Sequence, residues 1–148
     1  MPVGDYCHAP VEVVSADAPL RSVARVMERE RVGSVVVMEG ERVRGVVTDR
    51  DVALRVLAHA GDADALPVRD LLHRRPVVVH ADSRLGVAAG LMRRHALRRL
   101  PVLDRTQRLV GIISSDDLVG LVSRELRGLS RAVEGQRENA RREVEWDT

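Results

Sequence analysis

Two short stretches, Gly45–Asp51 and Gly111–Asp117, decide how this sequence is organised. They read GVVTDRD and GIISSDD. Each begins with glycine and two β-branched apolar residues, and each places an aspartate three positions after a hydroxyl residue. The apolar pair favours extended structure, whereas Ser/Thr-x-x-Asp is typical of a helix start. The chain therefore carries the same strand-to-helix unit twice.

The similarity extends well beyond these stretches and indicates an internal repeat. Pro2-Val3-Gly4-Asp5 recurs as Pro67-Val68-Arg69-Asp70, and identical residues follow in order at an offset of 65. One extra residue then raises the offset to 66 at the repeated motif. We assign the copies to 2–61 and 67–127, followed by a C-terminal segment, 128–148.

Each copy is predicted to read β-α-β-β-α. Short Val-rich strands are expected at 11–14, 35–38, 43–47, 77–79, 100–103 and 109–113, and helices begin near Asp17, Thr48, Ser83 and Ser114. The fold class is α/β (α+β), with small mixed sheets flanked by helices. Because about 60 residues bury little apolar surface alone, the copies should pack on each other about a pseudo-two-fold axis.

The end of the chain is less regular than the repeats. An apolar helical stripe continues to Val133, and the stretch EGQRENARREVEWDT at 134–148 loses it. This stretch is interpreted as a frayed or disordered charged tail. The alternative is a partner-binding helix that carries Trp146.

Composition excludes several classes of protein. The 148 residues carry 24 basic and 22 acidic side chains, all the basic ones arginine, with charges interleaved. Such interleaving, together with only Tyr6 and Trp146 as aromatics, argues against nucleic-acid binding. No apolar run reaches the roughly 18 residues of a membrane span, and no signal peptide is visible, so the cytoplasm is the expected location.

The sequence also contains no recognisable catalytic or metal-binding motif. Cys7, His8 and His73 lack the spacing of metal ligands, and a single cysteine excludes an internal disulfide framework. No nucleophile triad or glycine-rich phosphate loop is present. Neither an enzyme nor a required cofactor is expected. Cys7 aligns with Leu72 in the repeat and is interpreted as a small buried hydrophobic residue.

The hydroxyl and carboxylate of each motif have two interpretations. In Thr48-x-x-Asp51 and Ser114-x-x-Asp117, a carboxylate could accept hydrogen bonds from both hydroxyls of a ribose, beside a helix N-terminus that favours an anion. The same residues could simply form a capping box. The two roles are compatible.

The doubled motif resembles tandem cystathionine-β-synthase (CBS) domains, the pair called a Bateman module. The Pro-Val-x-Asp opening and the stretch RRLPVLD at 98–104 strengthen the resemblance, which covers about residues 2–127. It implies a stand-alone CBS pair that binds an adenosine-containing ligand between the repeats: AMP, ADP, ATP, S-adenosylmethionine or NAD. It also implies a disc-shaped homodimer.

The resemblance further assigns roles to individual residues. Asp51 and Asp117 would bind ribose, with Thr48 and Ser114 on ribose or phosphate. Basic residues at Arg98 and Arg99 would face phosphate. Apart from the resemblance, Arg50 could also reach a phosphate from its place inside the TDRD of the first motif. The base would lie near Glu12 and Val77, between Val32 and Leu97. The alternatives are a solvated arginine pair at a helix end for Arg98 and Arg99, surface ion pairing for Arg50, and core packing for the apolar residues.

The two clefts are chemically unequal. The first copy has Gly33 and Ser34 where the second has Arg98 and Arg99, so a phosphorylated ligand should prefer the cleft beside the arginines. The expected function is a regulatory sensor whose dimer changes conformation for an unknown regulated protein. The alternative is a ligand-free dimeric scaffold with degenerate nucleotide sites.

Overall fold

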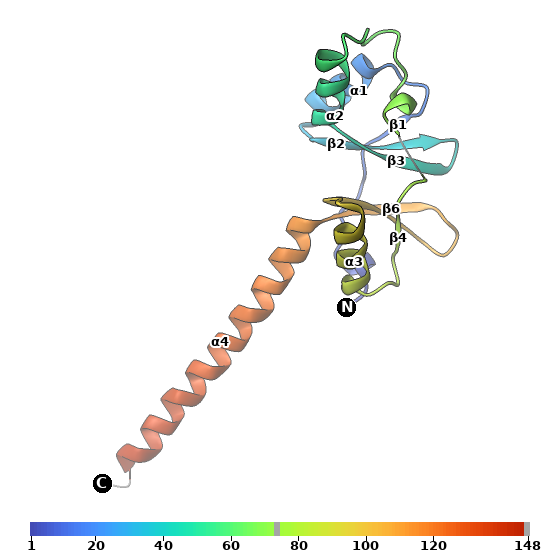
Figure 1. The fold of residues 1–148 in the computed structure, drawn as a ribbon. Helices are drawn as coiled ribbons and strands as arrows, with labels where there is room; N and C mark the ends of the chain where they lie inside the picture. The colour runs from blue at the N-terminus through green and yellow to red at the C-terminus, as the bar shows by residue number, and fades with distance from the viewer. Residues whose placement is uncertain (73–74, 147–148) are drawn as a thin grey trace. The chain divides into compact units, whose positions relative to one another are not determined.

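The computed structural model describes residues 1–72 and 75–146, with side chains described as far as residue 138. The first repeat contains the 3-10 turn η1 (Val3–Asp5), β1 (Val13–Ser15), α1 (Leu20–Glu30), β2 (Ser34–Glu39), β3 (Arg42–Thr48), α2 (Asp49–Ala53) and the π-helical turn η2 (Leu54–Ala58). The second contains η3 (Val68–Leu71), β4 (Val79–His80), α3 (Leu85–His95), β5 (Arg99–Leu103), β6 (Leu109–Ser114) and α4 (Ser115–Trp146). Figure 1 shows this order along the chain.

The strands form two small mixed sheets, ordered β1-β2-β3 and β4-β5-β6 (Figure 1). In each sheet the first pair is parallel and the second antiparallel. The antiparallel register shifts at Val37/Met38 in one sheet and at Val102/Leu103 in the other, which are equivalent positions of the repeat. The predicted fold class is confirmed, with strand ends displaced by up to about two residues.

The two sheets are joined by apolar side chains. Val36 of β2, Val43 of β3 and Leu103 of β5 form a buried cluster, against which Ile112 of β6 packs. The continuous valine run of β2 explains this arrangement, since a strand covered on both faces needs apolar residues at successive positions. Neither sheet therefore leaves its inner face to water.

Helix α1 illustrates why the predicted helices form where they do. Leu20, Val23 and Met27 recur at helical spacing and are buried on one face. Pro19 precedes the first turn, where its missing N–H costs nothing. The helix ends at Arg31 with φ 53°, and α3 ends in the same left-handed conformation at Ala96. Helix α3 begins at Leu85 rather than at the expected Ser83.

The opening segment of each repeat packs on the other repeat. Val3 donates its backbone N–H to Ser83 at 2.8 Å, and Val68 donates its N–H to Ala18 at 2.8 Å. Both valines are fully buried. Because Val3 and Val68 occupy equivalent positions, this reciprocal exchange is what a pseudo-two-fold axis requires.

Each motif has a glycine at its first position because the opening segment of a repeat packs closely against it. A Cβ on Gly45 would lie 2.8 Å from Leu72 Cδ2, and a Cβ on Gly111 would meet Cys7 Sγ. Cys7 and Leu72 are equivalent in the repeat, so each glycine makes room for the opening segment that crosses it. Burial raises the pKa of the Cys7 thiol. Cys7 is half-buried and serves as a packing residue.

The C-terminal segment corrects one prediction. Helix α4 is continuous from Ser115 to Trp146, whereas a frayed or disordered tail was expected from residue 134. The tail sequence is rich in Glu and Arg, which have high helix propensity even without an apolar stripe. The chain divides into two compact units, Met1–Ser115 and Asp116–Thr148.

Candidate ligand site between the repeats

The predicted capping box at the start of α2 is present. Thr48 Oγ1 accepts a hydrogen bond from the Asp51 backbone N–H at 3.2 Å, and Asp51 Oδ2 accepts one from the Thr48 N–H at 2.9 Å. Both residues thus stabilise the helix start. A carboxylate offers about four acceptor positions, so this single bond leaves Asp51 able to accept from a ligand as well.

Asp51 borders a cavity of about 980 Å³ that is lined by both repeats within the unit Met1–Ser115. The first repeat contributes residues of β3, α2 and η2, and the second contributes the segment before β4, the end of α3 and the start of β5. The volume lies in the range of sites that hold small ligands or cofactors. The lining combines apolar and charged side chains in equal number, seven of each, besides Gly45 and two histidines.

Arginine dominates the charge of this cavity. Five arginines line it against two aspartates, Asp51 and Asp70, and two histidines also face it. The arginines are Arg44, Arg55, Arg75, Arg94 and Arg99. Clustered guanidinium groups repel one another, and each presents a planar fork that fits phosphate or carboxylate oxygens. The cavity therefore favours an anionic ligand.

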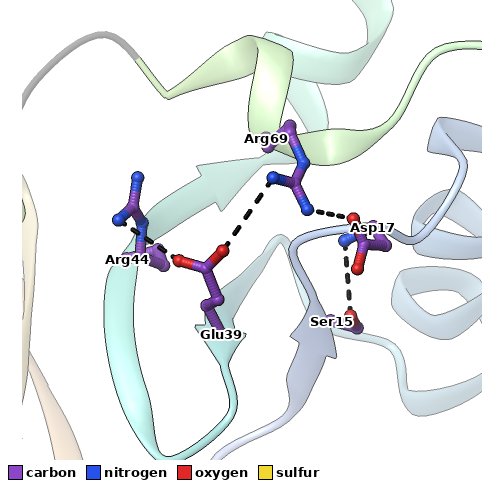
Figure 2. Close-up of polar contacts among 5 residues, drawn as sticks. All are labelled: Ser15, Asp17, Glu39, Arg44 and Arg69. Atoms are coloured by element: carbon purple, nitrogen blue, oxygen red, sulfur yellow. Dashed lines mark hydrogen bonds and ion pairs between the residues drawn. The ribbon is translucent and has the colours of Figure 1, made fainter.

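Arg44 connects this cavity to a chain of ion pairs that joins the two repeats (Figure 2). Its guanidinium lies 3.3 Å from Glu39, whose other carboxylate oxygen lies 3.9 Å from Arg69. Arg69 donates in turn to Asp17. The Arg44 and Glu39 side chains are each about half exposed, and such pairs contribute little to stability. An anion in the cavity can consequently compete with Glu39 for Arg44.

The structure brings four of the predicted ligand residues to this cavity. They are Asp51, Val77, Leu97 and Arg99. Asp51 belongs to the first motif, whereas the other three come from the second repeat. Arg99 and Asp51 therefore share a cleft through the packing of the repeats.

The remaining predicted residues lie elsewhere. Val32 lines a separate cavity of about 380 Å³ within the first repeat, where Glu28 and Asp49 are the charged residues. Arg50 is exposed on α2, and the carbonyl of Glu12 accepts from Val36 N–H at 2.9 Å.

In the second motif, backbone pairing is well defined. The carbonyl of Arg98 accepts from Ser115 N–H at 2.9 Å, and Ser114 pairs with Arg99 in the β5–β6 ladder. The equivalent bond in the first repeat joins Asp49 N–H to Gly33 at 3.0 Å. Asp117 lies in the first turn of α4, within the unit Asp116–Thr148.

Sequence reasoning missed several lining residues. Arg55 and His59 follow Asp51 at successive spacings of four, so helical periodicity alone could have placed them on the same face. Arg44, Arg75 and Arg94 give no such signal, because they reach the cavity only through the packing of one repeat on the other.

Two absences hold for the described part of the chain. Within residues 1–72 and 75–138, whose side chains are described, no group of three or more His, Cys, Asp or Glu side chains could hold a metal ion, and His73 lies outside those residues. Over the same residues, no helix is both long and apolar enough to cross a membrane.

Comparisons with known proteins agree with the repeat. The family model described as "CBS domain" matches twice, at residues 3–58 and 68–124. The CBS domain-containing protein YhcV of Bacillus subtilis is 35% identical over 127 residues, which cover 85% of this chain and 89% of that protein.

Similar pairs occur in different settings. The structure of CBS domain protein PAE2072 from Pyrobaculum aerophilum, complexed with AMP, has a TM-score of 0.72 and 30% identity, covering 80% of this chain and 90% of that chain. A homoserine O-acetyltransferase of Methanosarcina acetivorans is 27% identical over 120 residues, 80% of this chain but only 21% of that enzyme. This chain is a member of the CBS domain family and carries two CBS repeats in tandem.

Proposed function

We propose that this protein is a regulatory module that binds an adenosine nucleotide, through its phosphate and ribose, in the cavity between the repeats. The observation that carries the proposal is the meeting of Asp51 with five arginines around one cavity. The carboxylate suits the ribose hydroxyls, and the guanidinium groups suit the phosphate. The AMP complex of PAE2072 supports the same ligand class for a chain 30% identical to this one.

The proposed site pairs residues of the two repeats. Arg99 was expected to face the phosphate of a ligand in the cleft beside it. In the proposed site it works with Asp51 of the other repeat, because both line the same cavity. Val77 and Leu97, also in the lining, supply apolar surface for the base.

The regulatory step follows from the position of the ligand. A ligand that contacts both repeats binds most tightly when they are held together, and it can bias conformation only through such a difference in affinity. Competition for Arg44 would also release Glu39, which contacts Arg69 in η3 of the second repeat. We propose that a homodimer transmits this change to a regulated protein; sedimentation giving a monomer at micromolar concentration would contradict the dimer.

Calorimetric titration with AMP, ADP, ATP, S-adenosylmethionine and NAD tests the proposal, with adenosine as the phosphate-free comparison. Asp51→Asn keeps an oxygen for the Thr48 N–H and removes the charge, so it separates ligand binding from capping. The matched control is Asp49→Asn, which removes a charge from the same helical turn outside the large cavity. Asp51→Asn and Arg99→Gln should each weaken AMP binding by about 10- to 100-fold, the loss of one charge-assisted hydrogen bond.

The outcomes distinguish a nucleotide-binding module from a ligand-free scaffold. Arg99→Gln should leave adenosine binding nearly unchanged, because adenosine has no phosphate. Binding that is lost in Asp117→Asn and unchanged in Asp51→Asn would refute the assignment to this cavity. If no compound binds the wild-type chain, the aspartate is a helix cap alone, and the dimeric scaffold becomes the better description.

A further inference from the structure

Helix α4 carries an apolar seam that the ligand site does not use. Its exposed large hydrophobic residues are Val119, Val122, Leu126, Leu129 and Val133. Each is between 49% and 64% exposed, although the helix is continuous through all of them (Figure 1). Among described residues, these five form the main apolar surface of α4.

The spacing of the seam is that of a coiled coil. The intervals alternate three and four residues without interruption, which is the a and d pattern of a heptad repeat. Arg124 and Arg131 lie on the opposite face of the helix. A globular docking face usually spreads over a wider arc, whereas a strict a/d seam fits one neighbouring helix.

The composition of α4 also indicates that it needs a partner. Gly120, Gly128 and Gly135 lie within the helix, and a Cβ on any of them would meet nothing within 4 Å. They therefore make no close packing contact in compensation for their low helix propensity. Long helices in proteins owe most of their stability to packing of an apolar face, which here has to come from outside α4.

The side chains favour an identical helix in parallel orientation. The a positions hold Val119, Leu126 and Val133, and the d positions hold Val122 and Leu129. Three of these five residues, Val119, Leu129 and Val133, match the β-branched a and leucine d pattern of two-stranded parallel coiled coils. The e and g positions flank the a/d seam, and between residues 119 and 133 Glu125 is the only charged residue at such a position. Parallel pairing places it beside Ser130 of the second copy, whereas antiparallel pairing about Leu126 places it against another Glu125.

We propose that α4 binds α4 of a second copy of this chain as a parallel two-stranded coiled coil through residues 119–133. None of residues 119–133 lines the ligand cavity, so the proposed interface can be tested independently of the proposed nucleotide site.

Disulfide cross-linking in the full chain tests the proposal. In a Cys7→Ala background, Leu129→Cys places one thiol in the seam and Arg131→Cys places one on the opposite face. Parallel pairing brings the two seam thiols together at high effective concentration, so Leu129→Cys should cross-link at least on the order of tenfold faster. Adding Leu126→Gln should abolish the faster cross-linking of Leu129→Cys, whereas adding Arg124→Gln should leave that rate unchanged.

Each alternative has a distinct outcome. Equal cross-linking of Leu129→Cys and Arg131→Cys would overturn the proposal as nonspecific encounter. A Leu129→Cys thiol that neither cross-links nor reacts with a small thiol reagent would show the seam covered by its own chain, which also overturns it. Sedimentation gives a second reading, because the double variant Leu126→Gln/Leu129→Gln should lose association or helix content that Arg124→Gln/Arg131→Gln retains.

Discussion

Replacing Gly111 by alanine should destabilise the protein through one identifiable contact. The added Cβ would meet Cys7 Sγ and would lie 3.0 Å from both Cys7 Cβ and the His8 carbonyl oxygen. That carbonyl accepts from Ile112 N–H at 3.0 Å, while His8 N–H donates to Ile112 at 2.8 Å. The crossing segment can therefore yield only by weakening the hydrogen bonds that fasten it to β6.

The expected cost follows from this geometry. Overpacking against backbone that cannot relax costs about 1–3 kcal/mol. At about 2–4 °C per kcal/mol for a chain of this size, the melting temperature should fall by roughly 2–12 °C. Urea unfolding should show a lower midpoint with an unchanged slope, since the unfolded surface is nearly the same.

Gly45→Ala is the matched control at the equivalent position of the other repeat. Its Cβ would meet only the flexible side chain of Leu72, with Cδ2 at 2.8 Å and Cγ at 3.9 Å. Rotation of Leu72 relieves this contact, and alanine in a strand gains roughly 0.5–1 kcal/mol over glycine in conformational entropy. The net change should therefore be small.

A double-mutant cycle checks the cause. Cys7→Ala removes Sγ, so Gly111→Ala should cost less in that background, with a coupling of about 0.5–3 kcal/mol. The reasoning is refuted if Gly111→Ala is as stable as the wild type, or if Cys7→Ala provides no relief.

Further predictions concern the cap, an ion pair, the core and the cysteine. Thr48→Val should lower the free energy of unfolding by about 1 kcal/mol in thermal melts without ligand, because Asp51 N–H loses its acceptor. The hydrogen bond from Arg21 lowers the pKa of the Asp64 carboxyl. This pair therefore stabilises the fold at pH values above the carboxyl's ordinary pKa, and the stabilisation is lost as pH falls through the lowered pKa. The difference in unfolding free energy between wild type and Asp64→Asn should vanish in acid, and a difference that persists there would contradict this cause. Leu100→Ala should cost about 2–5 kcal/mol in urea unfolding, since Leu100 is fully buried in β5. Burial raises the pKa of the Cys7 thiol, so a thiol reagent at neutral pH should modify Cys7 more slowly than a cysteine in unfolded chain, and equal rates would argue against that burial.

The sequence by itself determined the local units of this protein and their repetition. The motif at Gly45–Asp51 predicted a strand followed by a capped helix because a short apolar run and a capping box depend on residues close together in the chain. The capping box of Thr48 and Asp51 is therefore present where it was expected. The offset between copies also predicted two similar mixed sheets, since equal patterns fold equally.

Only the tertiary structure decided which residues meet across the repeats. Arg99 shares a cavity with Asp51, and Cys7 lies against Gly111, because each repeat packs on the opening segment of the other. No local pattern encodes that docking, which depends on the summed fit of distant apolar faces. The extent of α4 has a different cause, because its C-terminal part lacks an apolar stripe and local helix propensity carries it to Trp146.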